Sequence, residues 1–190
     1  MVNIISESDN YTVVTEYKGL EKKSGTYQSE DALEKELIKK LNKRKVNYCY
    51  CIKELNIGKY KLDFLNTKVY DNENDNSNVI YTELNGYKFM FMGDAGIEKE
   101  KDILDKYNIS DIDVLKVGHH GSKTSSSKGF IDEIKPKYAI ISVGKNNRYG
   151  HPNKEVLNNL DNSKIYRTDQ DGSIMFKIKN NKLKIETCSP

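Results

Sequence analysis

Four residues with metal-binding or proton-transferring side chains stand directly after predicted strands: Asp94, His119, His120 and His151. They include every histidine of the chain. The preceding strands are expected at 87–92, 113–117 and 138–143. Strands joined by a helical crossover are normally parallel, so their C-terminal ends share one edge of the sheet, where open α/β sheets bind ligands. We therefore expect Asp94 and the His119–His120 pair to converge, with His151 as a further candidate.

A carboxylate and imidazoles form a ligand set suited to zinc or manganese. Two cations bridged by a carboxylate polarise a phosphoryl or carbonyl oxygen and activate water. Each residue also has a purely structural interpretation. Asp94 could cap the helix that follows it, and His151 could be a turn residue before Pro152. The His119–His120 pair could be a loop with one ring packed and one exposed, but adjacent histidines between glycines favour a site.

The elements that must position these residues alternate between strands and helices, which indicates an α/β fold. Asn85-Gly86 predicts a hairpin of strands 79–84 and 87–92, and Asn180-Asn181 predicts another of 173–178 and 182–187. The other expected strands are 11–17, 46–53, 60–65, 113–117, 138–143 and 164–167, and the expected helices are 29–44, 97–107, 128–134 and 154–160. The polar segment 71–78 is expected to be a loop.

Composition limits the partners. The 31 basic and 28 acidic residues give a net charge of +3, which is weak support for a nucleic-acid partner. The basic cluster 39–45 is expected to be a solvated helix face, with a nucleic-acid surface as the alternative.

No run approaches the roughly 18 apolar residues of a membrane span. Residues 1–10 lack the features of a signal peptide. We expect a soluble chain without membrane contact, and its compartment stays open.

Several other polar residues favour structural roles. Cys49-x-Cys51 has no second pair to complete a metal site, so both are expected to pack on a strand. The segment 122–127 has four hydroxyl residues besides Ser122, but no accompanying base and acid in the spacing of a nucleophile. A helix-capping loop is expected there. Asp111 and Asp113 are expected at the surface.

The ordered motifs resemble the competence-type branch of the metallo-β-lactamase fold, which is attached to bacterial DNA-uptake channel proteins. The matching segments are Gly93-Asp94-Ala95, 114–125, 137–144, Tyr149-Gly-His-Pro152 and 166–169. The resemblance implies a metal-dependent hydrolase with a four-layer αββα sandwich. We expect one partial domain over 1–190, matched over 53–190 and weakly matched over 1–52; the best part of the match is 76–178.

The resemblance also implies roles for the site residues. In such families the aspartate matching Asp94 bridges two metal ions, zinc or manganese, and one histidine of the matching pair is a terminal ligand. We expect His120 to be that ligand and His119 to position the substrate or the leaving group, although the two could be exchanged. His151 matches a motif near the pocket mouth. Phosphodiesters or nucleic acids are the expected substrates, although the wider fold also hydrolyses lactones, β-lactams and thioesters.

The main metal motif of the family, His-x-His-x-Asp-His, is absent from this sequence. A catalytic zinc normally takes three protein ligands, and Asp94 and His120 supply two. We therefore expect a C-terminal half, truncated at the N-terminus, that binds metal weakly and is impaired alone. A homo-oligomer or the missing half would complete it. The alternatives are an inactive remnant or binding module that retains the C-terminal sheet, and a nucleic-acid-binding module that uses residues 39–45.

Overall fold

The structure is a computed structural model that describes residues 3–7, 10–14, 43 and 53–188. The chain divides into two compact units, residues 1–52 and 53–190, and each is considered by itself.

In the first unit, β1 (Asn3–Glu7) and β2 (Asn10–Val14) pair in antiparallel orientation. The strand expected at 11–17 is therefore confirmed over 11–14, and β1 at Asn3–Glu7 was not among the expected strands. The expected strand at 46–53, with both of its cysteines, lies outside the described residues except for Lys53, which is not in a strand. So does the helix expected at 29–44, except for Lys43, which is helical and exposed.

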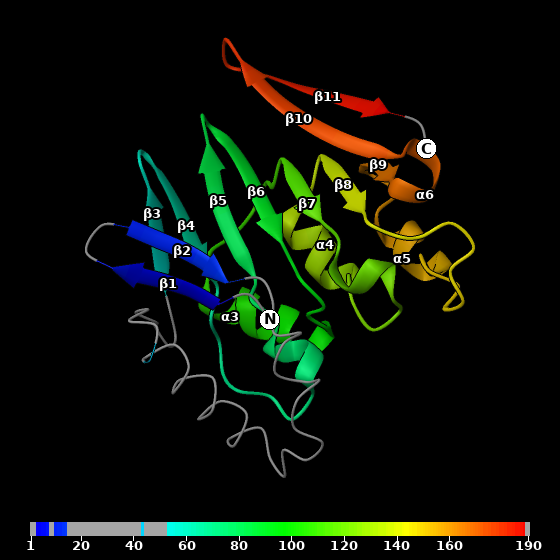
Figure 1. The fold of residues 1–190 in the computed structure, drawn as a ribbon. Coiled ribbons are helices and arrows are strands. Elements are labelled where there is room, and N and C mark those ends of the chain that lie inside the picture. Colours follow the sequence, from blue (N-terminus) through cyan, green and yellow to red (C-terminus); the bar gives the residue numbers. More distant parts are fainter. Residues whose placement is uncertain (1–2, 8–9, 15–42, 44–52, 189–190) are drawn as a thin grey trace. The chain divides into compact units, whose positions relative to one another are not determined.

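The second unit is built on one mixed sheet of seven strands (Figure 1). Their order in space follows the chain: β3 (Glu54–Ile57), β4 (Tyr60–Phe64), β5 (Ile80–Leu84), β6 (Tyr87–Phe91), β7 (Val114–Lys116), β8 (Tyr138–Ile141) and β9 (Lys164–Arg167). Neighbours from β3 to β6 are antiparallel, and neighbours from β6 to β9 are parallel. The predicted α/β pattern is confirmed, and the C-terminal ends of β6, β7 and β8 share one edge.

Two of the hairpin turns follow directly from residue type. Asn85 and Gly86 between β5 and β6 have positive φ angles of 49° and 84°. Asn180 and Asn181 between β10 (Ser173–Lys179) and β11 (Lys182–Cys188) have φ angles of 51° and 56°. A two-residue turn with both central φ angles positive matches the twist of the flanking strands, and asparagine and glycine tolerate it best. Both predicted hairpins are confirmed.

Three helices cover one face of the sheet: α3 (Ile97–Lys106), α4 (Lys128–Ile134) and α5 (Lys154–Asn159) (Figure 1). Alternate strand residues point to this face, so Met90, Leu115 and Ala139 are fully buried against helix residues such as Ile103 and Phe130. This apolar layer fixes the strands that carry the candidate site. Three short turns of helix complete the second unit: η1 (Glu73–Asn76), η2 (Gly118–Gly121) and α6 (Thr168–Asp171).

The hairpin of β10 and β11 packs on the other face. The rings of Phe89 and Phe176 meet edge to face, with centroids 5.9 Å apart. The hydroxyl of Tyr87 donates to Asn181 O and accepts from Leu183 N, each at 3.0 Å. These contacts confirm a mixed α/β architecture, and the four-layer sandwich stays a prediction. Within the described ranges, no helix combines the length and the apolar character that crossing a bilayer requires.

Candidate metal centre

The C-terminal ends of β6 and β7 bring two of the predicted site residues together. Asp94 Oδ1 lies 3.9 Å from His120 Nε2, and each side chain is about half exposed, at 47% and 52%. Two ligands of one tetrahedral zinc ion, each bonded at about 2.0–2.1 Å, stand about 3.3 Å apart. A small side-chain rotation closes this difference, so the two residues fit as ligands of one cation.

The hydrogen bonding of His120 determines which ring nitrogen faces Asp94. His120 Nδ1 lies 2.7 Å from the carbonyl oxygen of Ser142, at the end of β8. A carbonyl only accepts, so Nδ1 carries a proton, and in the neutral imidazole the lone pair is on Nε2, the nitrogen that lies toward Asp94. Metal-binding histidines commonly donate their other ring nitrogen to a backbone carbonyl in this way. The geometry therefore favours His120 over His119 as the ligand.

The histidine pair occupies a strained turn. His119 and His120 have φ angles of 44° and 56°, in the left-handed region that few residues other than glycine adopt, although asparagine, aspartate and histidine do so more often than the rest. Such residues cost about 1–3 kcal/mol each, and they persist where the surrounding structure holds them. Here His119 N donates to Gly93 O at 2.9 Å, which ties the turn to the loop of Asp94. The Nδ1 of His119 lies 3.4 Å from Thr124 Oγ1.

His151 lies beside this turn. Its ring centroid is 6.1 Å from that of His119, and a Cβ on Gly121 would stand 2.7 Å from Pro152 Cβ, so only glycine allows this close approach. Burial lowers the pKa of His151, and the neighbouring His119 and His120 lower it further. The structure thus places the ring of His151 beside the histidine pair, and its role there stays a prediction.

The ring of Tyr149 stacks on His151 with centroids 5.9 Å apart, and the side chain of Tyr149 is exposed. The guanidinium of Arg148 lies over the Tyr149 ring at 4.9 Å. An aromatic and a basic side chain therefore flank His151 at the surface.

The interpretation of Asp94 as a helix cap is wrong. Helix α3 begins at Ile97, and its N-cap is Gly96, which has no side chain. The backbone N–H of Asp94 instead donates to Ser77 Oγ at 3.1 Å. The Asp94 carboxylate is thus left to face His120.

A buried carboxylate that sequence reasoning missed supports the Asp94 loop. Asp75 is only 4% exposed, and its Oδ1 accepts from Gly96 N at 2.7 Å. Its Oδ2 accepts from Asn72 Nδ2 at 3.1 Å. The segment 71–78, predicted to be a loop, therefore contains η1 and braces the candidate site. Asn72 is the residue from which the sequence could have predicted this helical turn, because asparagine is a favoured N-cap. Its side chain accepts from Asn74 N and caps η1.

A second missed carboxylate supports the loop after the histidines. Glu100 on α3 is 1% exposed and accepts from the backbone N–H groups of Ser126 and Ser127 and from the Ser127 hydroxyl. Burial raises the pKa of Glu100, and these hydrogen bonds oppose that effect. Ser125 Oγ donates to the Gly118 and Ser122 carbonyl oxygens. The serine run is thus a structural loop before α4, as expected, with Ser127 at the N-cap position.

Of the two aspartates expected at the surface, Asp111 is exposed, whereas the prediction for Asp113 was wrong. Asp113 is 6% exposed because its carboxylate accepts from Lys88 N at 2.9 Å and pairs with Lys137 Nζ at 2.7 Å. It ties the starts of neighbouring parallel strands together at the edge opposite the candidate site.

The described part of the chain contains no group of three or more histidine, cysteine, aspartate or glutamate side chains that could hold a metal ion. Asp94 and His120 therefore fit as two ligands of a site that needs at least a third. His119 contacts Thr124 and His151 rather than Asp94.

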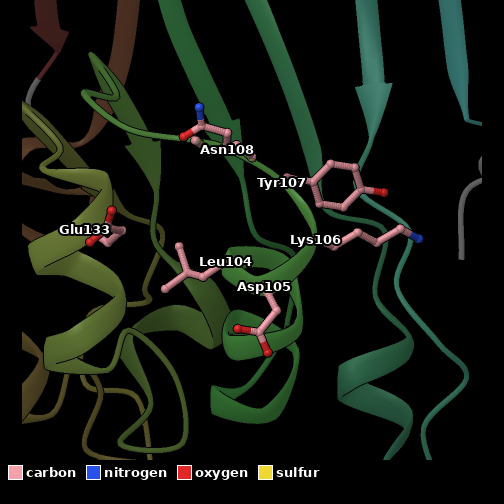
Figure 2. Close-up of a pocket in the computed structure, with 7 residues that line it drawn as sticks. Leu104, Asp105, Lys106, Tyr107, Asn108 and Glu133 are labelled. Carbon is pink, nitrogen blue, oxygen red and sulfur yellow. The ribbon is translucent and has the colours of Figure 1, made fainter.

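A separate recess of about 320 Å³ lies at the end of α3, and Glu133 of α4 also lines it (Figure 2). Tyr107 and Lys106 extend away from its centre in Figure 2. It contains no histidine, and it lies where α3 leads back to the start of β7. The candidate metal centre is at the opposite ends of these strands, so the recess is not part of it.

Comparisons with known proteins find relatives over a little more than half of this chain. The chain is 44% identical over 110 residues to ComE operon protein 3 of Bacillus subtilis (strain 168), 57% of this chain and 14% of that protein. It is 36% identical over 120 residues to Competence protein ComA of Neisseria gonorrhoeae, and this alignment covers 60% of this chain and 17% of that protein. It is 32% identical over 116 residues to Recombination protein 2 of Haemophilus influenzae (strain ATCC 51907 / DSM 11121 / KW20 / Rd), and this alignment covers 60% of this chain and 14% of that protein.

No protein-family model matches the chain. The aligned region spans no more than 17% of the length of these relatives, so their activities as whole proteins are not transferred by the comparison alone. The competence part of the predicted resemblance is confirmed: this chain has homologues among bacterial competence proteins.

Proposed function

We propose that this chain is part of a metal-dependent hydrolase that cleaves phosphodiester bonds of nucleic acids during DNA uptake. One observation carries the proposal: Asp94 and His120 face each other at 3.9 Å, and the bond to Ser142 O turns the free ring nitrogen of His120 toward the carboxylate. The competence-protein relatives support DNA as the substrate.

Asp94 and His120 would hold a divalent cation, zinc or manganese. When bound, such an ion polarises a phosphoryl oxygen and lowers the pKa of a coordinated water. His119 and His151 lie next to this pair and act as proton carriers for the leaving group or the attacking water. The lowered pKa of His151 keeps its imidazole neutral near pH 7, so it is ready to accept a proton.

Two ligands make a weak site, because structural and catalytic zinc ions normally take three or four protein ligands. The remaining ligands would come from outside the described residues, either from another copy of this chain or from the N-terminal half that the resemblance implies. The second candidate function is a binding module without catalysis. It is favoured by the absence of a third metal ligand beside Asp94 and His120 in the described residues.

The first test is metal affinity, measured by titration of the purified chain with zinc and with manganese. We expect weak binding that falls at least tenfold in Asp94→Ala and in His120→Ala, since each variant removes one of two ligands. Asp105→Ala is the matched control, because Asp105 is an exposed carboxylate on α3 away from the site.

Equal affinity in the wild type and in Asp94→Ala would overturn the metal site. Metal-dependent cleavage of single-stranded DNA by the chain, alone or with its partner, would support the hydrolase over the binding module. A metal-linked rise in melting temperature gives an independent readout, since a ligand at one hundred times its Kd stabilises the folded state by about 2.7 kcal/mol.

A further inference from the structure

A half-buried lysine lies next to the candidate metal centre, and the mechanism above does not use it. Lys116 is the last residue of β7, and in the parallel register it stands beside Phe91 of β6. Leu115 and Val117, before and after it, point into the helix-covered core. Because strand side chains alternate, Lys116 projects from the opposite face.

The direction of the side chain brings the ammonium to the C-terminal edge of the sheet. Lys116 Nζ donates to the carbonyl oxygen of Val117 at 3.1 Å, one residue further toward the His119–His120 turn. The negative charge of Asp94 is close enough to act on it. Phe91 is 41% exposed, so this side of the strand pair is open to solvent.

The ammonium of Lys116 is poorly satisfied. It has three donors, and within the described ranges its one hydrogen bond is to Val117 O, with no carboxylate paired to it. Burial lowers the pKa of Lys116, and the charge of Asp94 opposes this effect only in part. Burial also lowers the pKa of Lys99, which is only 4% exposed, but Lys99 is enclosed in the fold: it donates to Ser77 O, and its ammonium faces the ring of Tyr70 at 5.6 Å.

A partly desolvated cation without an anionic partner lowers the stability of the folded state. An anion that binds beside such a cation therefore stabilises the fold. We propose that Lys116 binds a phosphate group of a single-stranded nucleic acid, next to the cation position of Asp94 and His120. The ammonium neutralises the phosphate that the metal-bound side of the site would hold, and it supplies charge-assisted hydrogen bonds from the face opposite the helices. This inference rests on the proposed function for its substrate class.

The test is equilibrium binding of a fluorescently labelled hexathymidylate to the whole chain, followed by anisotropy in the presence of EDTA and at several salt concentrations. Lys116→Met keeps the length of the side chain and removes its charge, and Lys116→Arg keeps the charge. Lys123→Met is the matched control, because Lys123 is an exposed lysine in the loop just after the histidine pair.

We expect Lys116→Met to weaken binding about 10- to 100-fold, which corresponds to about 1.4–2.7 kcal/mol and is the size of one hydrogen bond to a charged group. The slope of log K against log salt should shrink by about 0.7, the value for one single-strand phosphate. Lys116→Arg should stay within a few-fold of the wild type, and Lys123→Met should lose less than threefold. Because methionine removes a desolvated charge, the melting temperature of Lys116→Met should equal or exceed that of the wild type.

Three results would overturn the proposal. The first is unchanged affinity and salt slope in Lys116→Met, or no binding of the oligonucleotide by the wild type. The second is an equal loss in Lys123→Met, which would mean general attraction. The third is a lower melting temperature in Lys116→Met, which would make the lysine structural. EDTA removes metal from the oligonucleotide assay, so this assay is independent of the metal titration. If the titration shows no metal site but Lys116→Met still weakens oligonucleotide binding, only the hydrolase proposal is rejected. If the metal site is found but Lys116→Met binds as the wild type does, only the phosphate site is rejected.

Discussion

Glu100 gives the sharpest test of how the fold supports the candidate site. Replacing Glu100 by alanine removes the acceptor of two backbone N–H groups and one hydroxyl. Ser126 is 1% exposed, so its amide would lose its acceptor without access to bulk water, at a cost of about 1–3 kcal/mol. Ser127 is only half buried and can recover part of its hydrogen bonding from solvent.

We therefore expect Glu100→Ala to lower the free energy of unfolding by about 2–4 kcal/mol. Glu100→Gln keeps the volume but turns an NH2 group toward one set of donors, so it should cost about 1–2 kcal/mol. Urea unfolding followed by far-ultraviolet circular dichroism measures both values, and it suits a chain without tryptophan. The total stability of a domain is about 5–15 kcal/mol, so these changes are readily measured.

Glu98→Gln is the matched control on the same helix. Glu98 is 60% exposed and pairs with Lys68 at the surface, so its loss should change stability by less than about 0.5 kcal/mol. If Glu100→Ala proved as mild as Glu98→Gln, the serine loop would be held by other contacts, and the role assigned to the buried carboxylate would be rejected.

Two further predictions concern two other carboxylates, Asp75 and Asp169. Asp75→Ala removes the acceptor of Gly96 N, so it should cost about 1–3 kcal/mol and weaken metal binding, whereas exposed Asp71→Ala should do neither; equal effects would reject the brace. The Arg167 guanidinium holds the pKa of Asp169 below its usual value of 3.8, so the stability it contributes is present above pH 3.8 and is lost as pH falls through the lower folded value. Asp169→Asn should therefore flatten the acid limb of a stability–pH profile below pH 3.8, and an unchanged limb would contradict the pairing.

The local patterns of this sequence determined most of the second unit. Asn85-Gly86 and Asn180-Asn181 adopt positive φ at low cost, and apolar alternation marks the strands, so both hairpins could be predicted from a few residues. The parallel order of β6, β7 and β8 follows from the helical crossovers between them. This was enough to predict that Asp94 and His120 converge, because both follow strands whose ends share an edge.

Other features depended on partners that are far apart in the sequence. Asp75 binds an amide 21 residues away, and Glu100 binds one 26 residues away. Asp113 is buried because Lys88 N, 25 residues before it, supplies a donor on the neighbouring strand. In the sequence these carboxylates look the same as exposed ones, since nothing local records which distant backbone group each will meet.

The same distinction applies to the site itself. The types and spacing of Asp94, His119 and His120 predicted a cation-binding edge from the sequence alone. The ring orientation of His120 and the single hydrogen bond that the Lys116 ammonium makes among the described residues were decided by tertiary structure. The physical reason is that a side chain's protonation and binding capacity depend on its hydrogen-bond partners and its exposure to water, and both are set only when separate strands and loops pack together.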